Sequence, residues 1–160
     1  MALLPLPAFR YAVLLGDSAN LLRTAIGTGL LAAGGGFTDC TGIGVTTEVL
    51  EYTEGGQNAF VHKLPTRTKP SDIVLKRGML LATDLWDWVR AFTEGTYQRK
   101  DGLIVLLATR GTPAQGWMFH RALPLSWTGP ALSASQNGVA TESLTLAHEG
   151  LELFDLTNLG

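Results

Sequence analysis

The amino-acid sequence predicts a mainly β fold with one α-helix. Most of the 160 residues fall in short apolar or alternating runs, which are typical of strands, and 19 glycines are available for the turns between them. One segment carries apolar residues at clear helical spacing. No internal repeat or low-complexity linker divides the chain, so we expect a single domain over residues 1–160.

The first half of the chain is expected to hold two strands, an insertion and a loop. Phe9–Leu15 is an apolar run that ends at a Gly-Asp turn. Asn20–Phe37 is apolar and glycine-rich, with Arg23 as its one ionised side chain, and we expect a flexible insertion at about residues 20–36 that orders against a partner. Gly44–Thr53 is rich in β-branched residues, as strands are. The polar stretch Gln57–Ser71 contains two prolines and is expected to be a long loop.

The predicted helix follows a short third strand, Asp72–Arg77, which ends at a glycine. Thr83 or Asp84 can cap the helix, because a short side-chain oxygen accepts hydrogen bonds from the free N–H groups of the first turn. Gly95 can end it, because glycine adopts the left-handed conformation at little cost. Trp88 points away from the apolar stripe and faces either a neighbouring subunit or its own sheet. The stripe consists of Leu85, Trp86, Val89 and Phe92.

The last third of the chain is expected to supply the remaining strands. Leu103–Ala108 is almost entirely apolar, which is typical of a central strand covered on both faces. Gly116–Leu123 and Val139–Ala147 alternate between apolar and polar residues, and Leu151–Asp155 is expected to close the sheet.

The composition favours a protein that assembles. Only 16% of the residues are charged, whereas about a quarter is usual in soluble domains, so part of the surface is expected to be covered by partners. A net charge of −2 argues against a basic nucleic-acid-binding face. No apolar run reaches the ~20 residues of a membrane helix, and no basic segment precedes the apolar start, so we expect neither membrane insertion by this chain nor a signal peptide.

Patterns that could support catalysis or ligand binding are weak. Gly27–Ala32 matches the G-x-G-x-x-A form of a dinucleotide fingerprint but does not link a strand directly to a helix. In a strand, Glu51 points to the opposite side from Glu48 and Glu54, so the three carboxylates do not converge. The single Cys40 excludes an intrachain disulfide and is expected to be buried.

The histidines favour the same conclusion. They are far apart and lack metal-ligand spacing, and His148, just before a glycine, is expected to be a hydrogen-bonded structural residue. We therefore expect no enzyme, no metal and no cofactor. The alternative from another class is a small-ligand-binding module that uses the glycine-rich insertion as a phosphate cradle.

Several stretches, taken in order, resemble the tail-tube family of contractile phages and related extracellular injection systems. Glu51–Asn58 (EYTEGGQN) resembles that family's "EYREGG-N" signature, and Lys63–Pro65 followed by Ile73–Gly78 resembles its "KLPG…ITLKRG" stretch. Gln98–Gly102 and Glu142–Leu151 continue the likeness. It runs from about Phe37 to Leu153, and Thr66 departs from it, since the family usually has glycine after Lys-Leu-Pro.

The resemblance implies a β-sandwich or barrel-like fold in which hexameric rings stack around a continuous β-barrel lumen that carries cargo or DNA. The implied partners are further copies of the chain, a sheath protein and the baseplate or spike. Assembly in the bacterial cytoplasm is implied, followed by service in a virion tail or an extracellular particle. The insertion leaves open a specialised initiator ring that joins the tube to the baseplate. The related effector-carrying ring of the type VI secretion system is a third interpretation.

The resemblance also suggests where subunits meet. The turn after the second strand and the loop that follows it are expected to contact the next ring, and the helix is expected to lie outside the sheet, toward the sheath. The candidate contact residues are Gly55, Gly56, Gln57, Lys63, Arg67, Lys69 and Trp88.

Overall fold

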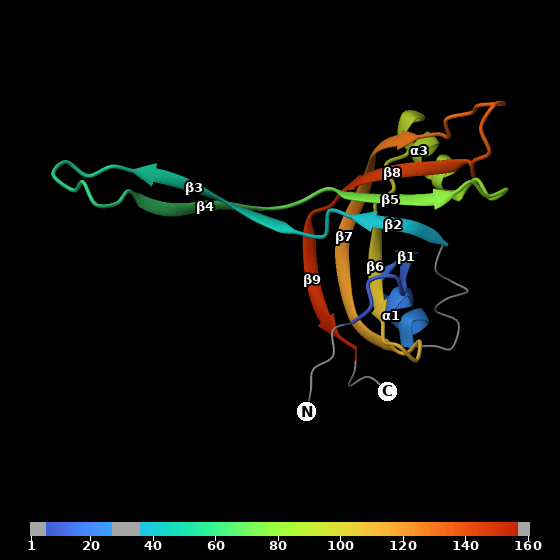
Figure 1. Ribbon diagram of the computed structural model, residues 1–160, viewed down its shortest axis with the longest axis horizontal. Coiled ribbons are helices and arrows are strands. Elements are labelled where there is room, and N and C mark those ends of the chain that lie inside the picture. Colours follow the sequence, from blue (N-terminus) through green and yellow to red (C-terminus); the bar gives the residue numbers. More distant parts are fainter. Residues whose placement is uncertain (1–5, 27–35, 157–160) are drawn as a thin grey trace.

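The fold is seen in a computed structural model, which describes residues 6–26 and 36–156 (Figure 1). The elements form an antiparallel β body from which a two-stranded ribbon projects. In chain order they are β1 (Tyr11–Gly16), α1 (Ser18–Ile26), β2 (Phe37–Thr41), β3 (Val45–Tyr52), β4 (His62–Pro70), β5 (Ile73–Gly78), α3 (Asp84–Thr93), β6 (Lys100–Leu107), β7 (Pro113–Thr128), β8 (Thr141–Ala147) and β9 (Gly150–Asp155).

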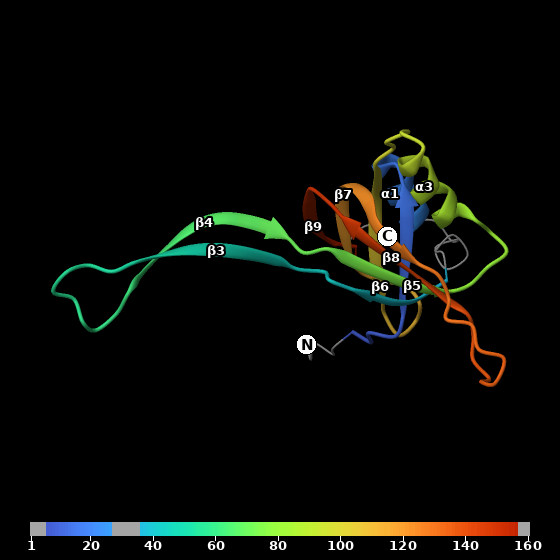
Figure 2. The ribbon, with the colours of Figure 1, turned by 90° about the horizontal axis from the view of Figure 1, so that it is seen from above.

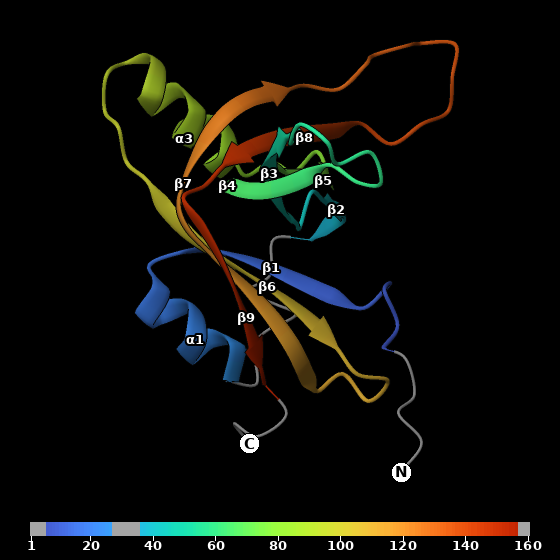
Figure 3. The same ribbon diagram turned by 90° about the vertical axis from the view of Figure 1, so that its left-hand side faces the viewer.

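Two sheets of the body share the long strand β7. Its first half pairs with β6 as far as Ala122 and with β9 as far as His120, and β1 pairs with the other edge of β6; we call this the β6 sheet. Its second half, from Leu123, pairs with β8, and the order continues through β5 to β2; we call this the β8 sheet. Figure 3, viewed along the ribbon, shows the two sheets meeting along β7.

β7 changes sheets at a bulge. His120 and Arg121 together lie opposite Asp101 of β6, and Arg121 has a φ of 52°. That left-handed conformation costs a non-glycine residue about 1–2 kcal/mol. The backbone N–H of Arg121 donates to the Asp101 carboxylate at 2.8 Å, and its guanidinium donates to Glu149 at 2.7 Å. These contacts hold the bend from which the two-sheet arrangement follows.

The apolar core lies on both faces of β6. Leu103 and Val105 pack with Leu21 of α1 on one face, and Ile104 packs with Phe119 between the two sheets on the other. The prediction of a central strand covered on both faces is therefore confirmed. The mainly β fold is confirmed as well, but with two helices in the described residues where the sequence predicted one.

The second helix, α1, occupies part of the expected insertion. Ser18–Ile26 contains no glycine, and Leu21 is buried against the β6 sheet, so this stretch belongs to the body. The prediction of a flexible insertion over about residues 20–36 was wrong for residues 20–26, which are helical. The prediction rested on the glycines that follow them in the sequence. Residues 27–35, which include the Gly27–Ala32 pattern, lie outside the described residues.

The predicted loop Gln57–Ser71 was also wrong in its larger part. Residues 62–70 form β4 and pair with β3, with Pro65 opposite Val49 and Pro70 opposite Val45. Proline lacks the N–H that a ladder needs and is confined to edge positions and bulges. A ribbon of two strands consists only of edges, which is why it accepts both prolines.

Candidate assembly surfaces

The β3–β4 ribbon, residues 45–70, projects from the body and is called the arm here (Figure 2). Every residue of β3 is exposed, and all of β4 is exposed between His62 and Pro70. Eight residues of strand extend about 27 Å, before the tip is counted. The arm therefore offers two uncovered faces at a distance from the core.

The arm leaves the body at a close crossing of two backbone segments. Gly42 has a φ of +87°, and a Cβ placed there would lie 1.9 Å from the carbonyl oxygen of Asp72. Just beyond, the N–H of Ser71 donates to the Gly44 carbonyl at 2.9 Å. Strands β2 and β5 pair on the body side of this crossing and β3 and β4 pair on the other, so the whole forms one long hairpin bent at Gly42.

The tip of the arm contains the first three predicted contact residues. The N–H of Gln57 donates to the Glu54 carbonyl at 3.2 Å, which closes a turn through Gly55 and Gly56. Gly56 has a φ of +91°, so the turn uses a conformation that favours glycine. The tip is exposed and lies at the far end of the molecule from the body (Figure 1).

The charged contact candidates also lie on the arm, but most face acids of the same arm. The ammonium of Lys69 forms an ion pair with Glu48, and Lys63 lies opposite Glu51 across the ribbon. His62 lies 3.2 Å from Glu54. Arg67 has no ion-pair partner among the described residues and is exposed. The three acids that formed the candidate catalytic cluster are therefore surface groups of the arm.

One face of the arm carries an apolar patch that the sequence interpretation did not single out. We call it the arm patch: Leu50, Tyr52, Phe60 and Leu64, each more than half exposed. Leu50 and Leu64 are paired across the ribbon, and the ring of His62 lies between those of Tyr52 and Phe60, at centroid distances of 6.4 and 5.0 Å. The sequence pattern that could have indicated the patch is the spacing of Leu50 and Tyr52, because residues two apart in a strand share a face.

Trp88, the remaining contact candidate, does not lie on the surface. Its side chain is 3% exposed and packs in the core between the sheets, and its indole N–H donates to the Gln98 carbonyl at 2.7 Å. The structure therefore shows the alternative in which Trp88 lies on its own sheet, and Trp88 is withdrawn as a contact residue. The helix begins after Thr83 and ends just before Gly95, but the Thr83 hydroxyl makes no capping hydrogen bond and donates to the Asp87 carboxylate at 2.7 Å.

A buried ion pair ties α3 to the β8 sheet. The guanidinium of Arg77 donates to Glu142 at 2.6 Å and to Asp84 at 2.7 Å, and both Arg77 and Glu142 are buried. Burial acts to raise the pKa of the Asp84 carboxyl, but the hydrogen bonds and charge of Arg77 outweigh it, so that pKa lies below its ordinary value. No local pattern in the sequence predicts the contact between Arg77 and Glu142, because the two residues are far apart in the chain.

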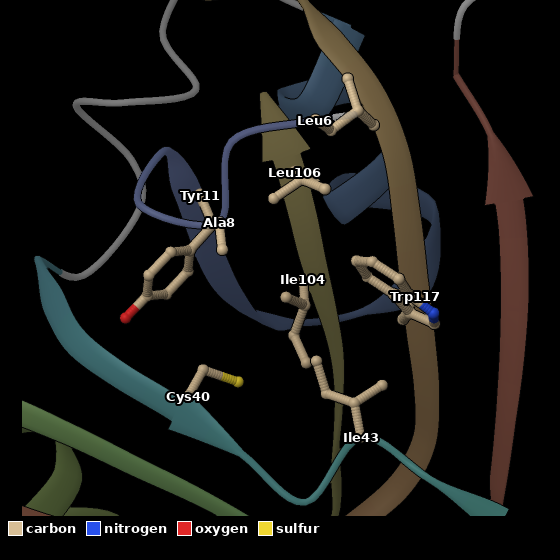
Figure 4. Close-up of a pocket in the computed structure, with 8 residues that line it drawn as sticks. All are labelled: Leu6, Ala8, Tyr11, Cys40, Ile43, Ile104, Leu106 and Trp117. Atoms are coloured by element: carbon tan, nitrogen blue, oxygen red, sulfur yellow. The ribbon is translucent and has the colours of Figure 1, made fainter. Parts of the chain in front are cut away.

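An apolar pocket of about 250 Å³ opens between the edge strands β1 and β2 (Figure 4). Its wall includes Tyr11, Cys40 and Trp117, and no charged side chain. Burial raises the pKa of the Cys40 thiol to about 11, so the thiol stays protonated at neutral pH. The glycine-rich stretch of the ligand-binding alternative, residues 27–35, lies outside the described residues, so this pocket is a separate feature.

The histidine and metal predictions can be compared with the structure. The two ring nitrogens of His148 each lie 2.9 Å from a backbone carbonyl oxygen, of Gly150 and of Ser71, which confirms the prediction of a structural histidine. Within residues 6–26 and 36–156, no His, Cys, Asp and Glu side chains gather in a group that could hold a metal ion. No helix in the same ranges is long and apolar enough to cross a membrane.

An antiparallel β body that extends an exposed ribbon with an apolar patch defines a β-structured subunit of a larger assembly. Comparison with protein families specifies which one. The family model of the T4-like virus tail tube protein gp19 matches residues 7–152, so the chain belongs to that family. No curated protein sequence matches it.

Solved structures agree on the fold. A chain of the PVC sheath–tube complex, an extracellular contractile injection system in its extended state, is 25% identical, with a TM-score of 0.77 over 94% of this chain and 92% of that one. A chain of the anti-feeding prophage baseplate, symmetrised sixfold, is 22% identical, with a TM-score of 0.80 over 98% and 99%. A chain of the tube-terminating cap of the same prophage is 24% identical, with a TM-score of 0.79 over 97% and 94%.

These findings establish the class of function. The chain is a tail-tube subunit of contractile phage-like injection systems, a structural protein and not an enzyme, as the resemblance implied.

Proposed function

We propose that this chain assembles into hexameric rings, that the rings stack into a hollow inner tube, and that the arm makes the contact between neighbouring subunits. The observation that carries the proposal is the arm itself. A two-stranded ribbon is marginally stable in water on its own, and this one packs on no other element along most of its length. A second copy that covers the arm would supply the missing burial.

The arm patch supplies the attraction for that contact. Fully burying a large apolar side chain contributes about 1.5–3 kcal/mol, so covering the exposed half of each patch residue contributes about 1 kcal/mol. The tip residues Gly55, Gly56 and Gln57 lie in the turn between Tyr52 and Phe60 and would follow the patch into the interface. Arg67 and Lys69, farther along β4, are candidates for the same contact, whereas Lys63 pairs with Glu51 on the opposite face of the arm and would lie outside it.

The β8 sheet supports closure into a ring. Its two free edges are β2 and the second half of β7, and its strands alternate in direction from one edge to the other. When the β2 edge of one copy meets the β7 edge of the next, the alternation continues and the joint is antiparallel. A head-to-tail contact of this kind closes into a ring when its rotation fits, and it removes both exposed edges. Sixfold symmetry is taken from the baseplate relative.

The remaining partners follow from the relatives. One similar chain belongs to a sheath–tube complex and another to a baseplate, so we propose that this chain meets a sheath protein through the outer face of α3 and a baseplate or spike protein at one end of the tube. Assembly would take place in the bacterial cytoplasm, with cargo or DNA in the lumen. An initiator ring at the baseplate is the alternative position for the same subunit.

Electron microscopy of the purified chain over a concentration series, with mass by light scattering, tests the proposal. Rings or tubes are expected. Leu64 and Val49 are both 51% exposed on opposite faces of the arm, so Leu64→Ser and Val49→Ser form a matched pair. We expect Leu64→Ser to abolish tubes, because the loss repeats at every subunit, and Val49→Ser to retain them. Equal behaviour of the two variants would show that the arm patch is not the contact.

A further inference from the structure

The long loop between β7 and β8 contains an asparagine followed directly by a glycine. Asn137 and Gly138 are both exposed, and neither belongs to a helix or a strand. The loop lies at the end of the β8 sheet away from the arm, because β5 begins beside the arm and its last residue, Gly78, pairs with Thr141, the first residue of β8 (Figure 1). The Asn-Gly pair is therefore open to water.

Asparagine is a thermolabile residue, because its side chain reacts with the backbone that follows it. The backbone nitrogen of Gly138 loses its proton and attacks Cγ of Asn137, which closes a succinimide ring. The bond from Cγ to the carboxamide nitrogen breaks, and ammonia leaves with the proton. Water then adds to either ring carbonyl. Opening the ring at Cγ gives aspartate, and opening it at the α-carbonyl gives isoaspartate, in which the main chain runs through the former side chain.

A glycine in the following position favours this reaction for steric reasons. Any other residue places a Cβ beside the attacking nitrogen, whereas glycine leaves the approach open and lets the backbone rotate more freely. In the described part of the chain, the N–H of Gly138 donates to no acceptor, and the carboxamide of Asn137 makes no hydrogen bond. Both reacting groups are therefore free to meet.

The other asparagines among the described residues lack this combination. Asn20 lies in α1 and precedes Leu21, whose N–H donates to a backbone carbonyl at 3.0 Å. Asn58 lies in the arm tip and precedes Ala59, whose N–H donates to the side-chain oxygen of Gln57 at 3.3 Å. In both cases the nitrogen that would attack is held by an acceptor and has a Cβ beside it.

We propose that Asn137–Gly138 is a self-modification site, at which the folded chain converts its own asparagine into aspartate and isoaspartate with water as the only other reactant. Asn137 supplies the carbon that is attacked, and Gly138 supplies the nucleophile. Exposure alone does not select this position, because Asn58 is exposed as well. The free N–H and the missing Cβ of Gly138 make the difference. The site is independent of the assembly proposed above.

The modification changes the loop in charge and in backbone length. Residues 129–140 contain no charged side chain, so each converted chain gains the first negative charge of this loop. Isoaspartate also adds a methylene to the main chain. Leu132 and Val139 of the same loop are 84% and 83% exposed, so the new carboxylate lies on an otherwise largely apolar surface. A carboxylate is costly to cover without a partner, so conversion weakens any contact made through this loop.

Peptide mapping by mass spectrometry tests the proposal on the purified chain, kept dilute so that it stays unassembled. Conversion at each asparagine is followed over several weeks at neutral pH, in the folded chain and in the same chain unfolded in urea. In the folded chain, Asn137 should convert several-fold faster than Asn20 and Asn58, at a rate comparable to its own rate in urea. Conversion of Asn137 in urea but not in the folded chain would overturn the proposal, because the fold would then hold the loop in an unreactive conformation.

Gly138→Ala is the matched variant. A Cβ at position 138 meets nothing within 4 Å, and the backbone there lies outside the left-handed region, so the variant should fold like the wild type. Its conversion at Asn137 should be several-fold slower, whereas Gly55→Ala, which is equally unobstructed, should leave that rate unchanged. Hydroxylamine cleaves a chain at a succinimide and should release residues 138–160 from the wild type far faster than from Gly138→Ala. Equal rates in the wild type and Gly138→Ala would contradict the cyclic route and overturn the proposal.

Discussion

Substituting Gly42 by alanine tests whether the bend at the base of the arm depends on glycine. The left-handed φ of +87° costs alanine about 1–2 kcal/mol. In addition, the new Cβ would lie 1.9 Å from the Asp72 carbonyl oxygen, more than 1 Å inside the closest normal approach, and a backbone atom cannot rotate away. Overpacking of this kind costs about 1–3 kcal/mol. The free energy of unfolding should fall by about 3 kcal/mol in total.

Thermal unfolding followed by circular dichroism measures this loss. For a chain of this size, about 3 kcal/mol lowers Tm by about 6–12 °C. Gly95→Ala is the matched control, because Gly95 has nearly the same φ, +88°, and nothing within 4 Å of its virtual Cβ. Only the conformational cost of about 1–2 kcal/mol remains there, so Tm should fall by about 2–8 °C, less than for Gly42→Ala. Equal losses in the two variants would refute the argument from the crossing at Asp72.

Two further predictions concern the ion pair beneath α3. Arg77→Met leaves Glu142 buried without its partner and should cost about 3–5 kcal/mol in urea unfolding, whereas the double variant with Glu142→Leu should recover much of the loss; a double variant as unstable as the single one would contradict this. Because the pKa of Asp84 is lowered in the folded state, its contribution to stability is present above the unfolded value of about 3.9 and is lost as pH falls through the folded value. Asp84→Asn should therefore flatten the acid limb of the urea midpoint, and an unchanged limb would assign the acid sensitivity to other groups.

The strands that the sequence predicted correctly are those whose burial follows their pattern. Residues 103–108 are apolar because both faces of β6 are covered, and residues 139–147 alternate because one face of β8 is open. In contrast, β4 was mistaken for a loop, because a strand exposed on both faces has no reason to carry an apolar pattern. Helix α1 was also missed, because the glycines at 27–35 made the whole segment appear unlike a helix in sequence.

The sequence predicted which segment holds most of the candidate contact residues, but it did not predict the apolar patch on the arm or the buried ion pair. All contact candidates except Trp88 lie on the arm, because the family resemblance was carried by its tip and second strand. Trp88 failed because it belongs to the buried stripe itself, at helical spacing from Leu85 and Phe92, whereas Trp86, which the prediction placed in that stripe, is 44% exposed. Arg77 and Glu142 are ordinary charged residues in sequence, and their burial depends on a strand pairing between distant segments that no local pattern encodes.

The arm has no net charge, and the proposed self-association gives a physical reason for this. The arm has as many acidic as basic side chains: Glu48, Glu51 and Glu54 against Lys63, Arg67 and Lys69. A surface that meets further copies of the same chain repeats its own charge at every contact, so any net charge would add repulsion with each subunit joined. Pairing the charges within the arm removes that repulsion and leaves the apolar patch to supply the attraction. The low charge content of the chain agrees with the proposed polymerisation, since a subunit that repeats along a tube can carry little uncompensated charge on the faces it buries.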